Sequence, residues 1–190
     1  MKKFLVIVMV AASSIVFGAD RGNEFDVDFN TIDQTSISVS LKKELKDKVT
    51  IKVLSANRRL TIHAETIKKT TEFKKRYDFS SLKEDNYIIS VSNGYYVYEK
   101  SIRIDENGIT ERFGASIRGE EEGKVEVRLF KDISKIKTIQ LIDGEGNTVF
   151  QTGRVRKRGY QFDISRLPRG LYSLEVVSAE TTVSKQIDKR

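Results

Sequence analysis

The chain has 190 residues, with 34 Lys and Arg against 27 Asp and Glu, and its formal net charge is +7. It contains no cysteine and one histidine. These counts exclude disulfides, thiolate chemistry and a lipid-modified N-terminal cysteine, and they argue against a zinc site, which usually needs about three or four nitrogen or sulfur ligands. The sequence therefore predicts no metal and no cofactor.

The first residues have the layout of a secretory signal peptide. Two lysines precede an apolar run from Phe4 to Phe17, and cleavage after Gly18 places Val16 at the −3 position. The alternative is an uncleaved anchor, but the run is shorter than the ~20 residues that cross a bilayer. We predict a signal peptide over residues 1–18 and no membrane span in the mature chain. The protein is then exported, and is periplasmic, cell-surface or secreted.

The rest of the chain contains one pattern twice. Residues 37–51 align with residues 125–139 at an offset of 88, and residues 77–91 align with residues 162–176 at an offset of 85. The difference of three residues falls in an intervening loop, where changes of length are tolerated. We therefore predict a first copy over residues 25–106 and a second copy over residues 113–190. The glycine-rich and acidic residues 105–123 indicate a connection, inside which the second copy begins.

Apolar residues alternate with a period of two in both copies. Ile37, Val39 and Leu41 share one face, as do Tyr172, Leu174 and Val176 in the second copy. Alternation of this kind indicates strands that are half buried in a sheet. Seven or so short strands per copy, separated by turn signals, predict an all-β protein of two tandem immunoglobulin-like antiparallel β-sandwich domains.

One turn motif recurs at the same place in each copy, and we call it the corner. In the second copy it consists of Asp163, Ser165, Leu167, Pro168, Gly170 and Tyr172, and in the first of Asp78, Ser80, Leu82 and Tyr87. Asp and Ser side chains accept hydrogen bonds from turn backbone, and Pro at i+1 with Gly at i+3 fits a type I turn. We expect the leucine to close the end of the core and the tyrosine to open the next strand.

The stretch F162-D-I-S-R-L-P-R-G-L-Y-S-L-E-V176 resembles the C-terminal sorting domains of proteins exported by the bacterial type IX secretion system, and related small exported bacterial Ig-like sandwich domains. The resemblance covers residues 125–190 and, more weakly, residues 37–104, where Lys83 replaces the proline and Asp85 the glycine. The family's usual opening Asn-Pro dipeptide is absent. The resemblance implies that outer-membrane export machinery reads the second copy.

Two features are candidate binding sites. Alternation places Tyr96 and Tyr98 on one strand face and Tyr95 on the other, so we expect Tyr95 to be exposed, where a tyrosine can stack on a sugar or anchor a protein. A basic cluster consists of Arg154, Arg156, Lys157 and Arg158. Such a cluster can contact an acidic glycan, or it can be solubilising charge at a strand edge. Export argues against nucleic acid as the partner.

No residue pattern specifies catalysis. His63 lies in an alternating stretch, with no nucleophile or orienting carboxylate set by spacing. Residues 143–147 resemble the start of a calcium loop, but Thr148 and Arg154 stand where glycine and glutamate are required. We predict a non-catalytic exported protein with a structural or interaction role, with secretion machinery or a cell-envelope component as partner. The alternative is a cell-surface or periplasmic binding module for carbohydrate or protein.

Overall fold

The computed structural model describes residues 27–41, 48–55, 60–68, 73–179 and 181–190, so the predicted signal peptide lies outside the described residues. The described residues form antiparallel strands and one 3₁₀ turn, Ile133–Lys135, with no α-helix among them. The predicted all-β fold is confirmed. The strands are β1 (Val27–Thr31), β2 (Ser36–Leu41), β3 (Val49–Ser55), β4 (Thr61–Ile67), β5 (Phe73–Asp78), β6 (Asp85–Ser92), β7 (Tyr96–Asp105), β8 (Gly108–Glu121), β9 (Lys124–Lys131), β10 (Ile136–Asp143), β11 (Thr148–Gln151), β12 (Gly159–Asp163), β13 (Gly170–Ser178) and β14 (Thr182–Lys189).

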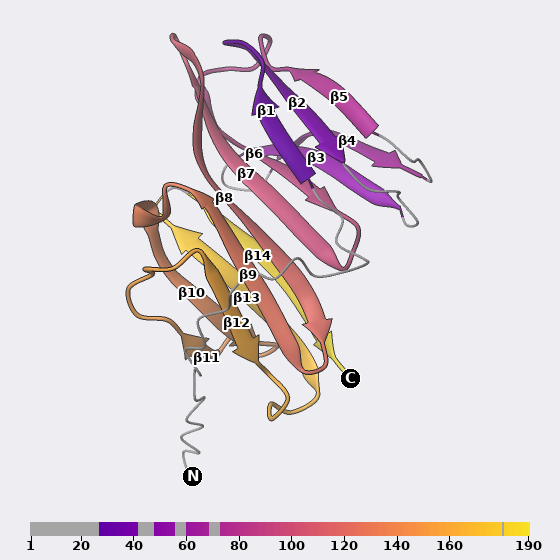
Figure 1. Ribbon diagram of the computed structural model, residues 1–190, viewed down its shortest axis with the longest axis vertical. Coiled ribbons are helices and arrows are strands. Elements are labelled where there is room, and N and C mark those ends of the chain that lie inside the picture. The colour runs from indigo at the N-terminus through magenta and orange to yellow at the C-terminus, as the bar shows by residue number, and fades with distance from the viewer. Residues whose placement is uncertain (1–26, 42–47, 56–59, 69–72, 180) are drawn as a thin grey trace.

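These strands form three sheets. A three-stranded sheet has the order β1-β2-β5, and a four-stranded sheet has the order β11-β10-β13-β14. The seven-stranded sheet, which we call the shared sheet, has the order β12-β9-β8-β7-β6-β3-β4 and runs from the upper to the lower half of the molecule (Figure 1).

The two copies have the same strand order and the same register. The order β1-β2-β5 corresponds to β8-β9-β12, and β4-β3-β6-β7 corresponds to β11-β10-β13-β14. At the offset of 88, the pair Phe29 and Val39 becomes the pair Ile117 and Val127. At the offset of 85, the pair Tyr87 and Ile102 becomes Tyr172 and Ile187. The repetition in the sequence is therefore a repetition of strand pairing.

Strand β8 joins the two copies. It pairs with β7, the last strand of the first copy, on one side and with β9 on the other. The four-stranded sheet of the first copy and the three-stranded sheet of the second are thereby continuous (Figure 1). The segment 105–123, which we expected to be a connection, is thus mostly strand. The physical reason is that pairing satisfies the backbone groups that each edge would otherwise leave open.

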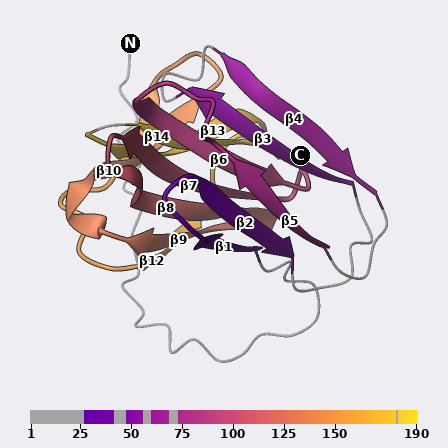
Figure 2. The ribbon, with the colours of Figure 1, turned by 90° about the horizontal axis from the view of Figure 1, so that it is seen from above.

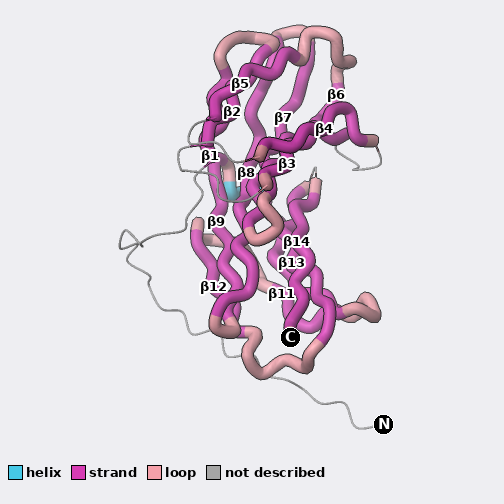
Figure 3. Tube along the Cα trace, turned by 90° about the vertical axis from the view of Figure 1, so that its right-hand side faces the viewer, coloured by secondary structure: helices cyan, strands magenta, loops and turns pink. Residues whose placement is uncertain are grey.

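The two hydrophobic cores lie on opposite faces of the shared sheet. Tyr98 of β7 belongs to the first core and pairs with Ser116 of β8, so Ser116 lies on the same face. The flanking residues of β8, Ala115 and Ile117, point to the other face and belong to the second core. The three-stranded sheet covers the first core, and the four-stranded sheet covers the second. Figures 2 and 3 show these layers from above and from the side.

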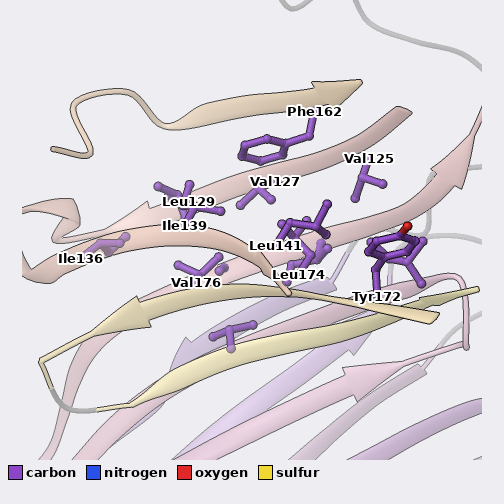
Figure 4. Packing of buried hydrophobic residues seen from close by; sticks show 14 of the residues in the cluster. Val125, Val127, Leu129, Ile136, Ile139, Leu141, Phe162, Tyr172, Leu174 and Val176 are labelled. Carbon is purple, nitrogen blue, oxygen red and sulfur yellow. The ribbon is translucent and has the colours of Figure 1, made fainter. Parts of the chain in front are cut away.

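The second core is built from alternating residues of both its sheets. Phe162 and Val127 of the shared sheet lie across from Leu141 and Leu174 of the four-stranded sheet (Figure 4). Leu174 is fully buried. Burial of one such side chain contributes about 1.5–3 kcal/mol. This packing holds β12 and β13, which the corner connects, on opposite sides of the core.

Candidate functional site

The corner of the second copy is built from three local hydrogen bonds. Asp163 Oδ1 accepts from the backbone amide of Ser165 at 2.9 Å. The amide of Leu167 donates to Ile164 O at 3.0 Å, and the Leu167 side chain is buried in the second core. Tyr172 donates its hydroxyl to Pro168 O at 2.9 Å. The side chains of Asp163 and Tyr172 thus bond to the backbone of the turn, while the side chain of Leu167 lies in the core.

The first copy has an equivalent corner. The Ser80 amide donates to Asp78 Oδ1 at 2.8 Å, and the Leu82 amide donates to Phe79 O at 2.9 Å. Tyr87 donates its hydroxyl to Lys83 O at 2.8 Å. A carbonyl accepts this bond equally well from lysine or proline, so the exchange of Pro168 for Lys83 leaves the geometry unchanged.

The aspartates of both corners are held ionised. The hydroxyl and the amide of Ser165 both bond to Asp163, and they lower the pKa of that carboxyl below its ordinary value. The amide and then the hydroxyl of Ser80 lower the pKa of Asp78 in the same way. Hydrogen bonds to the charged form favour that form. The aspartates therefore serve as turn acceptors.

Lys189 distinguishes the second corner from the first. Its Nζ donates to three corner carbonyls, Ile164 O at 2.7 Å, Ser165 O at 2.6 Å and Leu167 O at 2.5 Å. Lys189 pairs with Gly170 of β13, and the corresponding residue of the first copy, which pairs with Asp85, is Ile104. Lys189 of β14, the last strand of the second copy, thus bonds the backbone of that copy's corner through its charged amine. No pattern in the sequence pointed to Lys189.

Two further lysines occupy equivalent places on the core-facing side of β7 and β14. Lys100 is 7% exposed and Lys185 is 8% exposed. Lys100 Nζ donates to Phe29 O at 2.9 Å, and Lys185 Nζ donates to Gly94 O of the first copy at 2.5 Å. Burial lowers the pKa of Lys185. Lys100 thus connects β7 with β1 inside the first copy, whereas Lys185 connects β14 with the hairpin between β6 and β7 of the first copy.

Lys100 also belongs to a polar cluster at the junction of the copies. Its Nζ lies 2.8 Å from Glu111 Oε1, and Lys131 Nζ lies 2.7 Å from Glu111 Oε2. The Thr31 hydroxyl donates to Glu111 Oε1 at 2.9 Å. Burial opposes ionisation of Glu111, but the bonds from Lys100, Lys131 and Thr31 outweigh it and lower the pKa to about 2. This cluster connects β1 and β7 of the first copy with β8 and β9.

Tyr95 lies at the same junction and is half buried, whereas we expected it to be exposed. The Arg118 guanidinium lies 5.8 Å from the centre of the Tyr95 ring, and Arg118 Nε donates to the Tyr95 hydroxyl at 3.4 Å. Gly119 N donates to Tyr95 O at 2.8 Å. Strand β8 therefore covers this tyrosine, and Tyr96 and Tyr98 are buried in the first core as expected.

The basic cluster forms an exposed loop between β11 and β12. Arg154, Arg156, Lys157 and Arg158 are all exposed, while Val155 between them is buried in the second core. The Tyr160 hydroxyl accepts from the amides of Arg156 at 3.0 Å and Lys157 at 3.1 Å. Arg158 donates to Lys131 O at 3.0 Å. The loop thus presents its cations from an ordered backbone, on a different part of the molecule from Tyr95.

His63 lies close to ionisable side chains that the sequence pattern did not indicate. Glu65 on the same strand receives a bond from the Tyr77 hydroxyl and lies 2.6 Å from Lys75 Nζ, and His63 Nε2 lies 3.9 Å from Glu65 Oε1. Burial raises the pKa of Tyr77, and the bond to Glu65 raises it further. These contacts join β4 to β5 at one side of the first sandwich.

Two other kinds of site are absent from the part of the chain that the structure describes. No group of three or more His, Asp or Glu side chains there is placed to hold a metal ion. No helix there is long and apolar enough to cross a membrane.

Residues 121–189 match the family model described as the secretion system C-terminal sorting domain. The architecture is that of an antiparallel, immunoglobulin-like β-sandwich protein. Residues 121–189 are thus similar to sorting domains, and the resemblance to type IX secretion sorting domains is confirmed. The match links the chain to secretion machinery.

No curated protein matches the chain. Among solved structures, it is similar to domains 3 and 4 of rat CD4, with 9% identity, coverage of 82% of this chain and 94% of that one, and a TM-score of 0.32. It is also similar to a two-domain fibronectin type III segment of chicken tenascin, with 13% identity, coverage of 86% and 98%, and a TM-score of 0.28.

A biofilm-associated protein's BSP domain is similar at 16% identity and a TM-score of 0.28. The match covers 85% of this chain but only 28% of that one. At these identities and TM-scores, none of the three likenesses bears on function.

Proposed function

We propose that the protein is a non-catalytic exported protein of two sandwich domains, residues 25–106 and 113–190, in which the second domain is the signal for type IX secretion. The observation that carries this proposal is the sorting-domain match over residues 121–189, which contains the complete corner of that copy. A leader over residues 1–18 would take the chain to the periplasm, and the second domain would direct it onward to the surface or the medium.

The local structure of the second domain supports a role as a recognised unit. The corner projects beyond the core with Arg166, Arg169 and Leu171 exposed, and Leu171 is 58% exposed. Lys189 fixes the backbone behind these side chains through three carbonyl bonds. A rigid turn that displays apolar and cationic groups is a suitable contact for a protein receptor, because little conformational entropy is lost on binding.

The proposal is tested with a reporter protein that carries a periplasmic leader, produced in a bacterium with a type IX system. Residues 108–190 are fused to the C-terminus of this reporter, and the same reporter without them is the control. We expect the fusion at the surface or in the medium and the control in the periplasm. Retention of both in the periplasm would refute a sorting role.

A second candidate function is binding of an acidic ligand, and the basic loop is the observation that favours it. Arg154, Arg156 and Lys157 are exposed on a loop whose backbone Tyr160 holds in place. Such a cluster attracts polyanions in a salt-dependent way. The matched test compares binding of the protein to a sulfated glycan with that of the R154E/R156E double variant. Equal binding by both, or binding by neither, would remove this function.

A further inference from the structure

The two copies are joined by the pairing of β7 with β8, and the strands equivalent to these two, β14 and β1, are outer strands of their sheets. Strand β7 ends the first copy and pairs with β8, which begins the second. The equivalent of β7 is β14, and the equivalent of β8 is β1. Among the described strands, β14 pairs only with β13 and β1 pairs only with β2. In the described part of the chain, β14 and β1 are therefore open edges of the two types that pair as β7 and β8 at the junction.

The backbone groups of these edges point outward at known positions. At the junction, Gly119 N donates to Tyr95 O, so by alternation Ala115 and Ile117 also direct their amides and carbonyls toward β7. Because the registers of the copies agree, the corresponding residues of β1 are Val27 and Phe29. The corresponding residues of β14 are Ser184 and Thr182.

The equivalent lysines Lys100 and Lys185 have different partners beside the open edge of β1 and beside the paired edge of β8. On β1, whose outer side has no partner among the described strands, Phe29 O accepts from Lys100 Nζ. On β8, the equivalent residue Ile117 pairs with Val97 of β7, and Lys185 binds Gly94 O of the adjoining hairpin instead. A lysine that covers an edge carbonyl protects an open edge, and it can move aside when a strand takes that place.

Two of the other outer strands carry or adjoin several positive charges. Strand β5 carries Lys74, Lys75 and Arg76 in succession, and β12 follows the basic loop. Strand β1, with the sequence V-D-F-N-T, carries no lysine, arginine or proline. Since Lys, Arg and Pro are the usual means of blocking edges, β1 lacks these barriers to pairing, as do the outer strands β4 and β11. Among these three, β1 is the equivalent of β8, which pairs with β7 at the junction.

We propose that β14 of one molecule pairs antiparallel with β1 of a second molecule, in the register of β7 and β8, so that copies of this chain join head to tail. Ser184 then lies opposite Val27, as Glu99 lies opposite Ala115, and Thr182 lies opposite Phe29, as Val97 lies opposite Ile117. The interface is heterologous, so repeated joining makes rings or filaments. Because a single strand pair buries little surface, the association is weak and increases with concentration.

The absence of cysteine from the chain allows a direct test by cross-linking. Purified exported protein is prepared as the single variants Val27→Cys and Ser184→Cys, which are mixed and oxidised. Directly opposed strand residues are close enough for a disulfide. We expect the Val27–Ser184 heterodimer to form faster than either homodimer. The control is Thr148→Cys on β11, the other edge strand of the same sheet, in place of Ser184→Cys. Equal rates with Ser184→Cys and Thr148→Cys would overturn the proposal.

A second measurement follows self-association of the protein without cysteine substitutions. Sedimentation of the wild-type protein up to about 1 mM should show concentration-dependent species larger than the monomer, since a Kd in that range corresponds to a weak contact. Ser184→Pro removes an outward amide while leaving the pairing with β13, and it should abolish these species without changing the thermal midpoint. A monomer at every concentration would exclude head-to-tail joining. So would a folded Ser184→Pro variant that associates like the wild type. If that variant does not fold, the cross-linking result decides.

Discussion

Tyr87 and Tyr172 donate their hydroxyls to backbone carbonyls at equivalent positions, Lys83 O at 2.8 Å and Pro168 O at 2.9 Å. Both rings are buried at the ends of their cores, with burial raising the pKa of each hydroxyl. The two corners are thus held by the same interaction, although the residues of the turns differ. This equivalence permits the same substitution to be made once in each copy.

Tyr172→Phe and Tyr87→Phe each remove one such hydrogen bond and leave the ring in place. We expect each variant to lower the free energy of unfolding by about 1 kcal/mol, the usual net worth of a hydrogen bond of this kind. Urea unfolding followed by circular dichroism measures the change. Wild-type midpoints for both variants would show that the tyrosine bonds do not hold the corners.

Lys189→Met should destabilise the second copy by roughly 2 kcal/mol, because bonds from a charged donor are worth more than neutral ones. Arg190→Ala is the control, since that side chain is 91% exposed and pairs only with Asp188 in the structure. The expected result is earlier unfolding of the Lys189 variant in urea and an unchanged midpoint for the Arg190 variant. Equal midpoints for the two variants would mean that Lys189 does not brace the corner.

Stability should fall in acid because of Glu111. Its pKa is about 2 in the folded protein against an ordinary value of 4.5, so the folded state holds the proton less tightly than the unfolded state. The stabilisation, about 3 kcal/mol for a shift of this size, is present above pH 4.5 and is lost as the pH falls toward 2. Glu111→Gln should flatten this part of the profile and lower stability at neutral pH, since Lys100 loses its partner.

The measurement is the free energy of unfolding as a function of pH for the wild type and Glu111→Gln, with exposed Glu145→Gln as the control. The Glu145 variant should follow the wild type. If the Glu111 variant shows the same slope as the wild type between pH 4.5 and 2, the cluster at the junction does not contribute as described.

The shared sheet predicts specific short proton distances. Tyr98 and Ser116 form a non-hydrogen-bonded pair across β7 and β8, and such pairs bring the two Cα atoms to about 4.5 Å. A strong Hα–Hα cross-peak between these two residues is therefore expected in a nuclear Overhauser spectrum. A spectrum that shows the pairs within each copy but lacks this cross-peak would mean that the sheets are separate.

Much of this architecture is readable from the sequence. Alternation of apolar residues identified strands in both copies, and the offsets of 88 and 85 correspond to the observed registers. Both signals are local or depend only on comparison of the chain with itself. The corner residues also stand out in the sequence, because Asp, Ser, Pro and Gly have specific roles in turns.

The pairing of β7 with β8 at the junction could not be predicted from these sequence signals. Segment 105–123 has the glycines and acidic residues of a connection, yet most of it is β8, because the edge of β7 lies next to it. Pairing between strands of different copies depends on which edges meet, which alternation does not report. The same strand covers Tyr95, which is why that residue is half buried.

The buried lysines did leave a signal in the sequence. Lys100 has the same parity as Tyr98 and Ile102, and Lys185 has the same parity as Val183 and Ile187. A lysine on an apolar face must reach a polar partner with its amine. The partners themselves, Phe29 O and Gly94 O, are distant backbone atoms, and only the fold identifies them.

We propose that the two copies of one fold differ in role and that only the second directs export. The most direct measurement attaches each copy to the same leader-bearing reporter, residues 27–107 in one fusion and residues 108–190 in the other, and determines the fraction of reporter outside the periplasm. We predict that the fusion with residues 108–190 leaves the periplasm and that the fusion with residues 27–107 stays. Equal release of both reporters, or release of neither, would contradict this claim.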